Sequence, residues 1–145
     1  MNLNEYQNYH ETKSHTVSEF PYNTYLCSIP LDFSLVPLHW HAEFELIVIK
    51  KGRGLVAVDL NRQPVSAGDL VFIRPGQLHS IEQDGSHSME YENIIFKKEL
   101  LTSGDDDLCA RQFFDPLMAG KIPSVSFFTP AAVCYEEVSD CFRQI

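Results

Sequence analysis

The sequence predicts a mainly β protein, an antiparallel barrel or sandwich followed by C-terminal helices. Three observations carry the prediction. Residues 22–96 contain short apolar runs rich in β-branched and aromatic residues, only a few residues connect these runs, and helical periodicity takes over after residue 100. With 145 residues, 44% of them apolar, the chain is long enough for one domain with its own core. We expect an arm (residues 1–20), a barrel (21–100) and a helical segment (101–145).

The arm is polar, with isolated aromatic residues at Tyr6, Tyr9 and Phe20 and no sustained period. We expect it to be ordered only where these aromatic side chains pack on the rest of the chain. It lacks the apolar core of a secretion signal, and no apolar run in the chain approaches the ~18 residues of a membrane span. These features predict a soluble, cytoplasmic protein without a membrane partner.

The barrel is predicted from six strand-length segments: TYLCSI, FELIVIK, GLVAVDL, DLVFIRP, LHSIEQ and YENIIF. The connections KKGRG, LNRQP, SAGD, PGQ and QDGSHS are rich in the Gly, Pro, Asn and Asp typical of turns. Such short connections join antiparallel strands, because a parallel pair needs a crossover of a dozen or more residues. Gly52–Gly54 predicts a hairpin, since no helix follows that would make it a phosphate-binding loop.

The first part of the helical segment opens with SGDDD, whose acidic residues suit the positive N-terminus of a helix. Leu108, Phe113 and Leu117 supply an apolar face. Pro116 is expected to end this helix, and Asp115–Pro116 to open a second short turn closed by Gly120.

The last helix is predicted in TPAAVCYEEVSDCFRQI, with Thr129 as N-cap and Pro130 at the first position. Its apolar stripe comprises Cys134, Val138, Cys141, Phe142 and Ile145. The stripe has no C-cap, so we expect the chain to be the front portion of a longer protein. The four cysteines, which form no CxxC pair, are expected to be free and mostly buried.

The formal charge argues against nucleic-acid binding by this chain. It carries 11 Lys and Arg against 20 Asp and Glu, a net charge of −9, and has no basic run. Binding to DNA depends largely on basic side chains that neutralise phosphates. We therefore expect this chain to contact DNA only through a part that it does not contain.

The candidate site begins in LHWHAEFELIV. His39 and His41 share one side of a strand, and Trp40 takes the other. Glu45 has the same parity as His39, but six residues of straight strand span about 20 Å. Glu45 can therefore join the histidines only if the chain bends between His41 and Glu45. A further candidate, His79, begins a later strand just after a Pro75–Gly76 turn.

Three interpretations of His39, His41, Glu45 and His79 stay open. By ligand type they suit a divalent metal such as Zn, Ni, Fe or Mn. They could equally line a metal-free polar pocket, or be purely structural. In every case the binding form is neutral histidine, so occupancy should weaken as the pH falls through roughly 6.5.

The pair HWHAEFE and GDLVFIRPGQLH resembles the two signature motifs of the cupin superfamily, small antiparallel jelly-roll barrels. The resemblance implies that His39, His41, Glu45 and His79 converge inside the barrel, often on a divalent metal. Two positions depart from the pattern, Phe33 where a glycine is usual and Gln83 where an asparagine is usual. Neither departure falls on a ligand position.

Over roughly residues 20–145 the chain resembles, more narrowly, the N-terminal sensor domain of AraC-type bacterial transcription regulators. PLHWHAEFELIVIKKGRG, AGDLVFIRPGQLHSI and the tail ARQFFDPLMAGKIPSVSFFTP carry this likeness. It implies a barrel that binds a small effector, often a sugar or related metabolite, and helices that pair two subunits into a homodimer. It also implies a C-terminal DNA-binding region that is absent from this chain, and no enzymatic activity.

Two other functions remain open. One is a metal-dependent cupin enzyme, a dioxygenase or isomerase that uses the same four residues. The other is an interaction module with an empty barrel.

Several further residues are candidates for the pocket. Ile47 and Phe72 are predicted to line the barrel interior and the ligand, with simple core packing as the alternative. Arg74 could reach an anionic ligand at the barrel mouth, or be a solvated surface residue. His10, His15 and His87 lie in polar stretches and are expected to be solvated.

Overall fold

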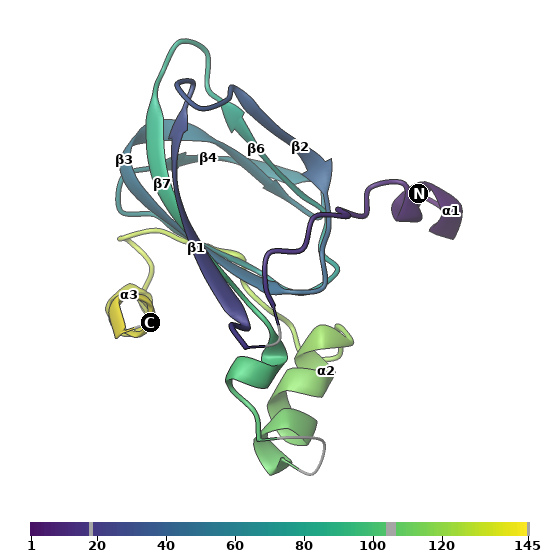
Figure 1. Ribbon diagram of the computed structural model, residues 1–145. Helices are drawn as coiled ribbons and strands as arrows, with labels where there is room; N and C mark the ends of the chain where they lie inside the picture. The colour runs from purple at the N-terminus through teal and green to yellow at the C-terminus, as the bar shows by residue number, and fades with distance from the viewer. Residues whose placement is uncertain (18, 104–106, 145) are drawn as a thin grey trace.

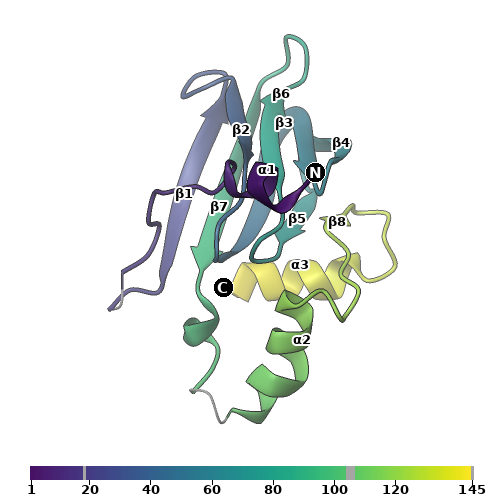
Figure 2. The ribbon, with the colours of Figure 1, turned by 90° about the vertical axis from the view of Figure 1, so that its right-hand side faces the viewer.

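A computed structural model describes residues 1–17, 19–103 and 107–144 of the chain. Strands from residue 22 to residue 96 form an antiparallel barrel (Figure 1), and the helices that follow residue 96 gather below it (Figure 2). The N-terminal arm, with its short helix α1 (Leu3–Gln7), lies against the side of the barrel. The predicted mainly β fold followed by helices is confirmed. None of the helices described is long and apolar enough to cross a membrane.

The barrel consists of two layers of antiparallel strands that share one long strand, β3. In one layer the order is β1-β7-β3-β5-β8, and in the other β6 lies between β2 and β3, with β4 on the opposite side of β3. The strands are β1 (Tyr22–Ile29), β2 (Leu35–His39), β3 (Phe44–Val58), β4 (Asn61–Ser66), β5 (Leu70–Ile73), β6 (His79–Gln83), β7 (Met89–Phe96) and β8 (Phe127–Phe128).

Gly52 marks the place where β3 passes from one layer to the other. Residues 45–48 pair with β5, whereas residues 54–58 pair with β6, and the register with β7 shifts between Ile49 and Lys51. Gly52 has φ +72°, and a Cβ there would meet the carbonyl oxygen of Ser88 at 1.9 Å. The predicted hairpin at Gly52–Gly54 is therefore wrong, because β3 continues through these residues and Gly52 directly follows a β-bulge between Ile49 and Lys51.

The hairpin that follows β3 has a two-residue turn at Asp59 and Leu60. Both have positive φ, +49° and +67°, and Val58 pairs with Asn61 across the turn. Positive φ at both central residues is the geometry that lets a two-residue turn match the twist of its strands. The sequence signal for this turn was weak because neither residue is glycine.

The core has two parts. The interior of the barrel holds a fully buried apolar cluster that includes Ile47, Val71 and Tyr91. A second cluster on the outer face of the β7-β3-β5 layer is centred on Phe44, whose ring lies 5.9 Å from that of Phe72. The partly buried residues packed against this second cluster are Phe72, Phe114, Leu117, Met118 and Phe142. The helices thus cover the outside of this layer.

Residues 108–118 form one helical run, so the prediction that Pro116 ends the first helix is wrong. A π-helical segment, η2 (Ala110–Phe114), runs directly into α2 (Asp115–Met118), and the Asp115 N–H bonds to the Ala110 carbonyl. Pro116 lacks an N–H and disturbs the α-helical ladder, and a wider turn in front of it accommodates that disturbance. Gly120 (φ +67°) closes the helix as predicted, and its N–H donates a hydrogen bond to the Leu117 carbonyl.

The apolar face of this helical run differs from the prediction. Leu108 and Phe113 are 73% and 55% exposed, whereas Phe114, Leu117 and Met118 pack on the barrel. A π turn contains one residue more than an α turn, which rotates the residues after it relative to the predicted face. Residues 104–106 of the predicted helix start lie outside the described residues.

The last helix, α3, spans Tyr135–Gln144, so the predicted start at Thr129 is wrong. Residues 129–134 form turns instead, the Ala132 N–H bonding to the Thr129 carbonyl. Val138, Ser139 and Phe142 face inward. The predicted stripe therefore fails at Cys134 and Cys141, which are exposed, and its last member, residue 145, lies outside the described residues.

All four cysteines are free, as predicted, but they are not mostly buried. Cys109, Cys134 and Cys141 are exposed, and only Cys27 is half-buried. Burial raises the pKa of the Cys27 thiol.

The short helix η1 (Lys98–Leu100) joins β7 to the helical segment.

Candidate functional site

The chain bends between β2 and β3, where the sequence argument required it to bend. β2 ends at His39, residues 40–43 lie outside any strand, and β3 begins at Phe44. The backbone N–H of Gly76 donates to the His41 carbonyl (2.9 Å), which joins this bend to the turn that precedes His79. Two segments distant in the sequence therefore meet at one end of the barrel.

The structure brings His39, His41 and His79 together. The ring centroids are 4.1 Å apart for His39 and His79, 5.0 Å for His41 and His79, and 5.8 Å for His39 and His41. One ring nitrogen from each imidazole lies within 4.8 Å of the other two. The side chains of His79 and His41 are 1% and 3% exposed, and that of His39 is 18% exposed.

Backbone carbonyls orient two of the three imidazoles. Nδ1 of His39 donates to the Pro37 carbonyl (2.8 Å), and Nδ1 of His79 donates to the Gln77 carbonyl (2.9 Å). A carbonyl only accepts, so Nδ1 carries the proton in each ring and Nε2 presents its lone pair toward the cluster. Histidines that bind metals are usually fixed by this kind of outer hydrogen bond.

Glu45 lies directly beside two of the histidines. Its Oε2 is 3.0 Å from His41 Nε2, with which it forms a hydrogen bond, and 3.1 Å from His79 Nε2. The contact with His79 lacks hydrogen-bond geometry, so His79 Nε2 is a buried nitrogen without a hydrogen-bond partner. His41 Nδ1 is also buried without such a partner, 3.7 Å from Glu43 Oε2.

The carboxylate and the imidazoles change one another's pKa. Burial alone would raise the pKa of Glu45, but the hydrogen bond from His41 and the charges of the histidines hold it well below its usual range. Burial opposes protonation of His41, yet the hydrogen bond and charge of Glu45 raise its pKa. The pKa of His39 is lowered, first by burial and then by His79. The site thus contains an ionised carboxylate beside an imidazole that readily becomes charged.

These residues fit a divalent metal. Three imidazole nitrogens and one carboxylate form a ligand set that suits Zn, Ni, Fe or Mn. The unpartnered, buried Nε2 of His79 is the observation that favours such an ion, because a buried polar atom normally has a partner. The residues that would hold the ion are His39, His41, His79 and Glu45.

A cavity of about 190 Å³ lies against the cluster, inside the barrel. It is bordered by His39, His41 and Glu45 on one side and by Tyr91 and Asn93 of β7 on another. The Tyr91 hydroxyl and Asn93 Oδ1 are both buried and have no hydrogen-bond partner. Sequence reasoning missed both residues, although their alternate positions in one strand place them on a common face.

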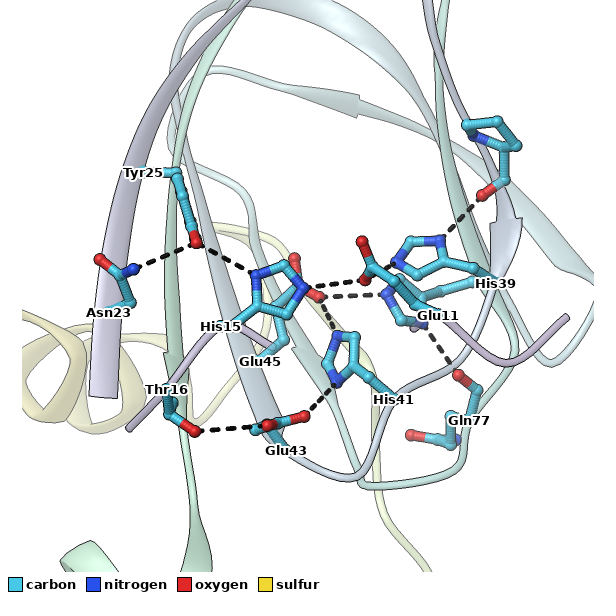
Figure 3. Close-up of polar contacts among 12 residues, drawn as sticks. Glu11, His15, Thr16, Asn23, Tyr25, His39, His41, Glu43, Glu45 and Gln77 are labelled. Atoms are coloured by element: carbon cyan, nitrogen blue, oxygen red, sulfur yellow. Dashed lines mark hydrogen bonds and ion pairs between the residues drawn. The ribbon is translucent and has the colours of Figure 1, made fainter. Parts of the chain in front are cut away.

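The N-terminal arm adds two residues that sequence reasoning also missed, Glu11 and His15. Figure 3 shows Glu11 between His15 and His39, with Oε2 2.8 Å from His15 Nε2 and 3.6 Å from His39 Nε2. The side chain of His15 is only 8% exposed and also contacts the Tyr25 hydroxyl (3.2 Å). The expectation that His15 is solvated is therefore wrong. His10 and His87 are exposed, as predicted, and the ring of His10 also stacks on Trp40 at 4.2 Å.

The other predicted pocket residues lie elsewhere. Ile47 is fully buried in the barrel interior, within the apolar cluster that contains Tyr91. Phe72 packs in the outer cluster against Phe44, so it does not border the cavity beside the histidines. Arg74 borders a different, larger groove of about 580 Å³, and its Nη1 donates to the Leu117 carbonyl (3.0 Å). Of these two cavities, the smaller one is lined by His39 and His41, whereas neither histidine lines the larger groove.

The comparison with known families settles what kind of domain this is. A family model described as the AraC-like ligand binding domain matches residues 31–145. The chain belongs to this family. The resemblance to the sensor domain of AraC-type regulators, predicted from the two motifs and the tail, is thereby confirmed.

Two curated relatives resemble this AraC-type domain. It is 33% identical over 104 residues to an uncharacterized HTH-type transcriptional regulator, YdeC, of Bacillus subtilis, a match that covers 67% of this chain and 36% of that protein. It is 38% identical over 63 residues to the oxalate-binding protein of Thermotoga maritima, covering 43% of this chain and 52% of that protein. The chain thus spans between about a third and a half of these relatives.

A solved structure supports the fold of the AraC-type domain. A cupin protein from Bacteroides fragilis superposes with a TM-score of 0.51 and 21% sequence identity, covering 61% of this chain and 75% of that one. The predicted cupin barrel is therefore confirmed.

Proposed function

We propose that this chain is the effector-sensing part of a transcription regulator and is not an enzyme. Its cavity would take a small hydroxyl-bearing molecule, such as a sugar or a related metabolite, next to a divalent metal held by the histidine cluster. Membership in the AraC-like ligand binding family and the similarity to an HTH-type regulator support this proposal. The regulator would bind DNA through a part outside this chain, and would therefore act in the cytoplasm.

The two unpartnered polar atoms of the cavity carry the proposal for the ligand. Burial raises the pKa of Tyr91, so its hydroxyl stays protonated and can donate, while Asn93 Oδ1 needs a donor. A ligand hydroxyl both donates and accepts, and so satisfies both atoms, whereas a carboxylate only accepts. The carboxylates of Glu11 and Glu45 also border this cavity and disfavour an anion that approaches without a metal.

The size of the cavity limits the ligand to roughly one ring. A cavity of about 150 Å³ holds benzene in a well-characterised case, and this cavity measures about 190 Å³. A monosaccharide-sized molecule or a smaller one is therefore the expected effector. The apolar side chains of Phe33, Val36 and Ile81, which border the same space, would cover its less polar faces.

The helical segment is proposed to pair two copies of the chain. Leu108 and Phe113 are large apolar residues that remain 73% and 55% exposed on one helical run. Exposed apolar side chains that gather on one element commonly mark an interface. A ligand that favours one arrangement of the barrel and helices would then shift the equilibrium between two states of the dimer.

The test is a thermal-shift panel of monosaccharides, polyols and small carboxylates, followed by calorimetry on any compound that stabilises the chain. We expect a hydroxylated compound to bind. Tyr91→Phe should weaken its binding by about tenfold, because the hydrogen bond from Tyr91 is lost while the one to Asn93 remains. Tyr22→Phe, at an exposed tyrosine, serves as the matched control. No stabilisation by any compound, with a monomer in solution, contradicts the proposal.

A metal-dependent cupin enzyme is the second candidate, favoured by the inward Nε2 atoms and Glu45. A bound divalent ion would supply a Lewis acid that polarises a substrate oxygen. The residues themselves would hold that ion and exclude water from the cavity. Metal analysis of tag-free protein, with turnover assays that include oxalate because of the Thermotoga maritima relative, separates the two functions. A full equivalent of metal with turnover supports the enzyme, and metal without turnover supports the sensor.

A further inference from the structure

We propose that Glu11, carried by the N-terminal arm, is a further ligand of the divalent metal held by His39, His41, His79 and Glu45. Metal binding would then fasten the arm to the barrel. The inference rests on the metal-holding cluster of the proposed function. It adds a ligand that comes from a different part of the chain.

The arm is fixed beside the cluster through Trp40, the residue between two of the metal-binding histidines. The Trp40 N–H donates to the Tyr9 carbonyl (2.9 Å), and the Glu11 N–H donates to the Trp40 carbonyl (2.9 Å). The ring of Tyr6 stacks on Trp40 at 4.8 Å, with the planes 9° apart. Since Trp40 follows His39 directly, these contacts hold the backbone of Glu11 next to the cluster.

Two further hydrogen bonds anchor the same stretch of arm. Trp40 Nε1 donates to the Tyr6 carbonyl (2.9 Å), and the Tyr6 hydroxyl donates to the Gly76 carbonyl (2.5 Å). Gly76 belongs to the turn that leads into His79. The arm is thus attached to both segments that supply the histidines.

The Glu11 carboxylate points at the exposed side of the cluster. Its Oε2 lies 3.6 Å from His39 Nε2, and His15 Nε2 holds the same oxygen at 2.8 Å (Figure 3). Two ligands about 2.1 Å from one metal lie roughly 3–3.5 Å apart in tetrahedral or octahedral geometry. The 3.6 Å between Glu11 Oε2 and His39 Nε2 is close to this spacing, and His15 would orient the carboxylate from outside, as outer hydrogen bonds commonly do.

The charges agree with this arrangement. Glu45 reaches His41 and His79, while Glu11 approaches His39 from the arm. Two carboxylates would balance the two charges of the ion, which lowers the cost of burying it. Burial opposes ionisation of Glu11, but the hydrogen bond to His15 and the charges of His39 and His41 lower its pKa, so the group is an anion.

A simpler role for Glu11 makes a different prediction. If Glu11 only pairs with His15, the arm should keep the same mobility whether or not a metal is bound. If Glu11 is a ligand, metal binding should slow the opening of the arm, and loss of the Glu11 carboxylate should weaken metal binding.

The experiment uses the whole chain, stripped of metal with a chelator and titrated with Co²⁺ as the probe. Cobalt affinity is measured by calorimetry and by the visible absorption band, and arm mobility by hydrogen exchange of amides in residues 3–17. The variants are Glu11→Gln, which keeps the size of the side chain, and Glu19→Gln, an exposed arm glutamate, as the matched control. Circular dichroism checks that each variant folds.

We expect Co²⁺ to slow exchange in the arm of the wild-type chain and of the Glu19→Gln variant. Glu11→Gln should bind Co²⁺ about 10- to 100-fold more weakly, show an altered absorption band, and lose the slowing of exchange. Wild-type cobalt affinity in Glu11→Gln, or an arm indifferent to cobalt in the wild-type chain, overturns the inference. A wild-type chain that binds no cobalt overturns it as well. In that case the proposed sensor function still stands or falls on the thermal-shift panel.

Discussion

Glu45→Gln is the substitution that tests the electrostatics of the site most directly. It keeps the shape of the side chain and removes the charge that His41 and His79 face at 3.0 and 3.1 Å. Glu45 and both histidines are at most 3% exposed, so water screens these contacts little. We expect the variant to fold but to be clearly less stable than the wild-type chain.

The magnitude follows from the burial of the pair. Removing one partner of a buried ion pair costs roughly 3–5 kcal/mol when the other charge is left behind. Here His41 can release its proton, and the glutamine amide can still hydrogen-bond one imidazole. We therefore expect Glu45→Gln to lower the free energy of unfolding by about 3 kcal/mol, the lower end of this range. For a chain of this length that corresponds to a loss of about 6–12 °C in Tm.

The pH dependence has a defined sign. The pKa of Glu45 is lowered in the folded chain, so its contribution is present above its ordinary value of 4.5 and is lost as the pH falls. The pKa of His41 is raised, so its contribution is complete below 6.5 and is lost as the pH rises through the raised value. The pair should therefore stabilise the wild-type chain most between pH 4.5 and 6.5, and the variant should lose that maximum.

The assay is urea unfolding followed by circular dichroism from pH 4 to pH 8, in the presence of a chelator so that metal binding does not contribute. Glu90→Gln is the control, since Glu90 pairs with Lys51 at 3.0 Å but on the surface, where such pairs contribute under about 1 kcal/mol. A loss below about 1 kcal/mol in Glu45→Gln, comparable to that of a surface pair, would refute the electrostatic account of the site. An unchanged pH profile would refute it too.

Three further outcomes are expected. Gly52→Ala should lower the free energy of unfolding in urea titrations by about 3 kcal/mol, because the new Cβ would overlap Ser88 and the residue has positive φ. The control Gly85→Ala also has positive φ but nothing within 4 Å of the new Cβ, so it should cost only about 1 kcal/mol. Equal losses in the two variants would contradict the close packing at Gly52. Sedimentation of the Leu108→Glu, Phe113→Glu double variant should show a monomer where the wild type is a dimer, and an unchanged mass counts against pairing through this run. Three thiols should react quickly with a disulfide reagent and one, Cys27, slowly; four equal rates would contradict its burial.

The sequence predicted the fold and the histidine cluster because both have strong local patterns. Alternating apolar residues and short turns specify antiparallel strands, and the two motifs place His39, His41, Glu45 and His79 at fixed positions. The distance argument made a bend between His41 and Glu45 the condition for Glu45 to join the histidines, since a straight strand would have carried Glu45 too far from His39, and the structure has that bend at residues 40–43. These inferences needed no knowledge of how distant side chains pack.

The sequence could not reveal what the arm contributes. Glu11 and His15 lie in a polar stretch without periodicity, and only tertiary contacts with Trp40 bring them to the cluster. Gly52 was misread for a related reason, because a glycine between apolar runs is compatible with a turn and with a bulge. The packing of the neighbouring strand decides between the two, and that packing is a property of the whole sheet.

The helical segment shows the same limit. Pro116 normally ends a helix, and only the π segment before it lets the helix continue. Cys134 and Cys141 have helical spacing, but α3 begins after Cys134 and turns its Val138 and Phe142 side toward the barrel. The spacing of residues in the sequence predicts which side chains share one face of a helix. Which face packs on the barrel depends on where the helix begins, and the sequence did not predict that position correctly.

The position of Trp40 also gives the molecule a built-in optical signal. It is the chain's single tryptophan, and its indole stacks with the ring of Tyr6 and with that of His10. Tryptophan emission therefore originates at one known place, where the arm meets the bend carrying His39 and His41. Lifting the arm would expose the indole to water and shift that emission to longer wavelength, so the opening of the arm can be timed in a stopped-flow instrument without any attached dye.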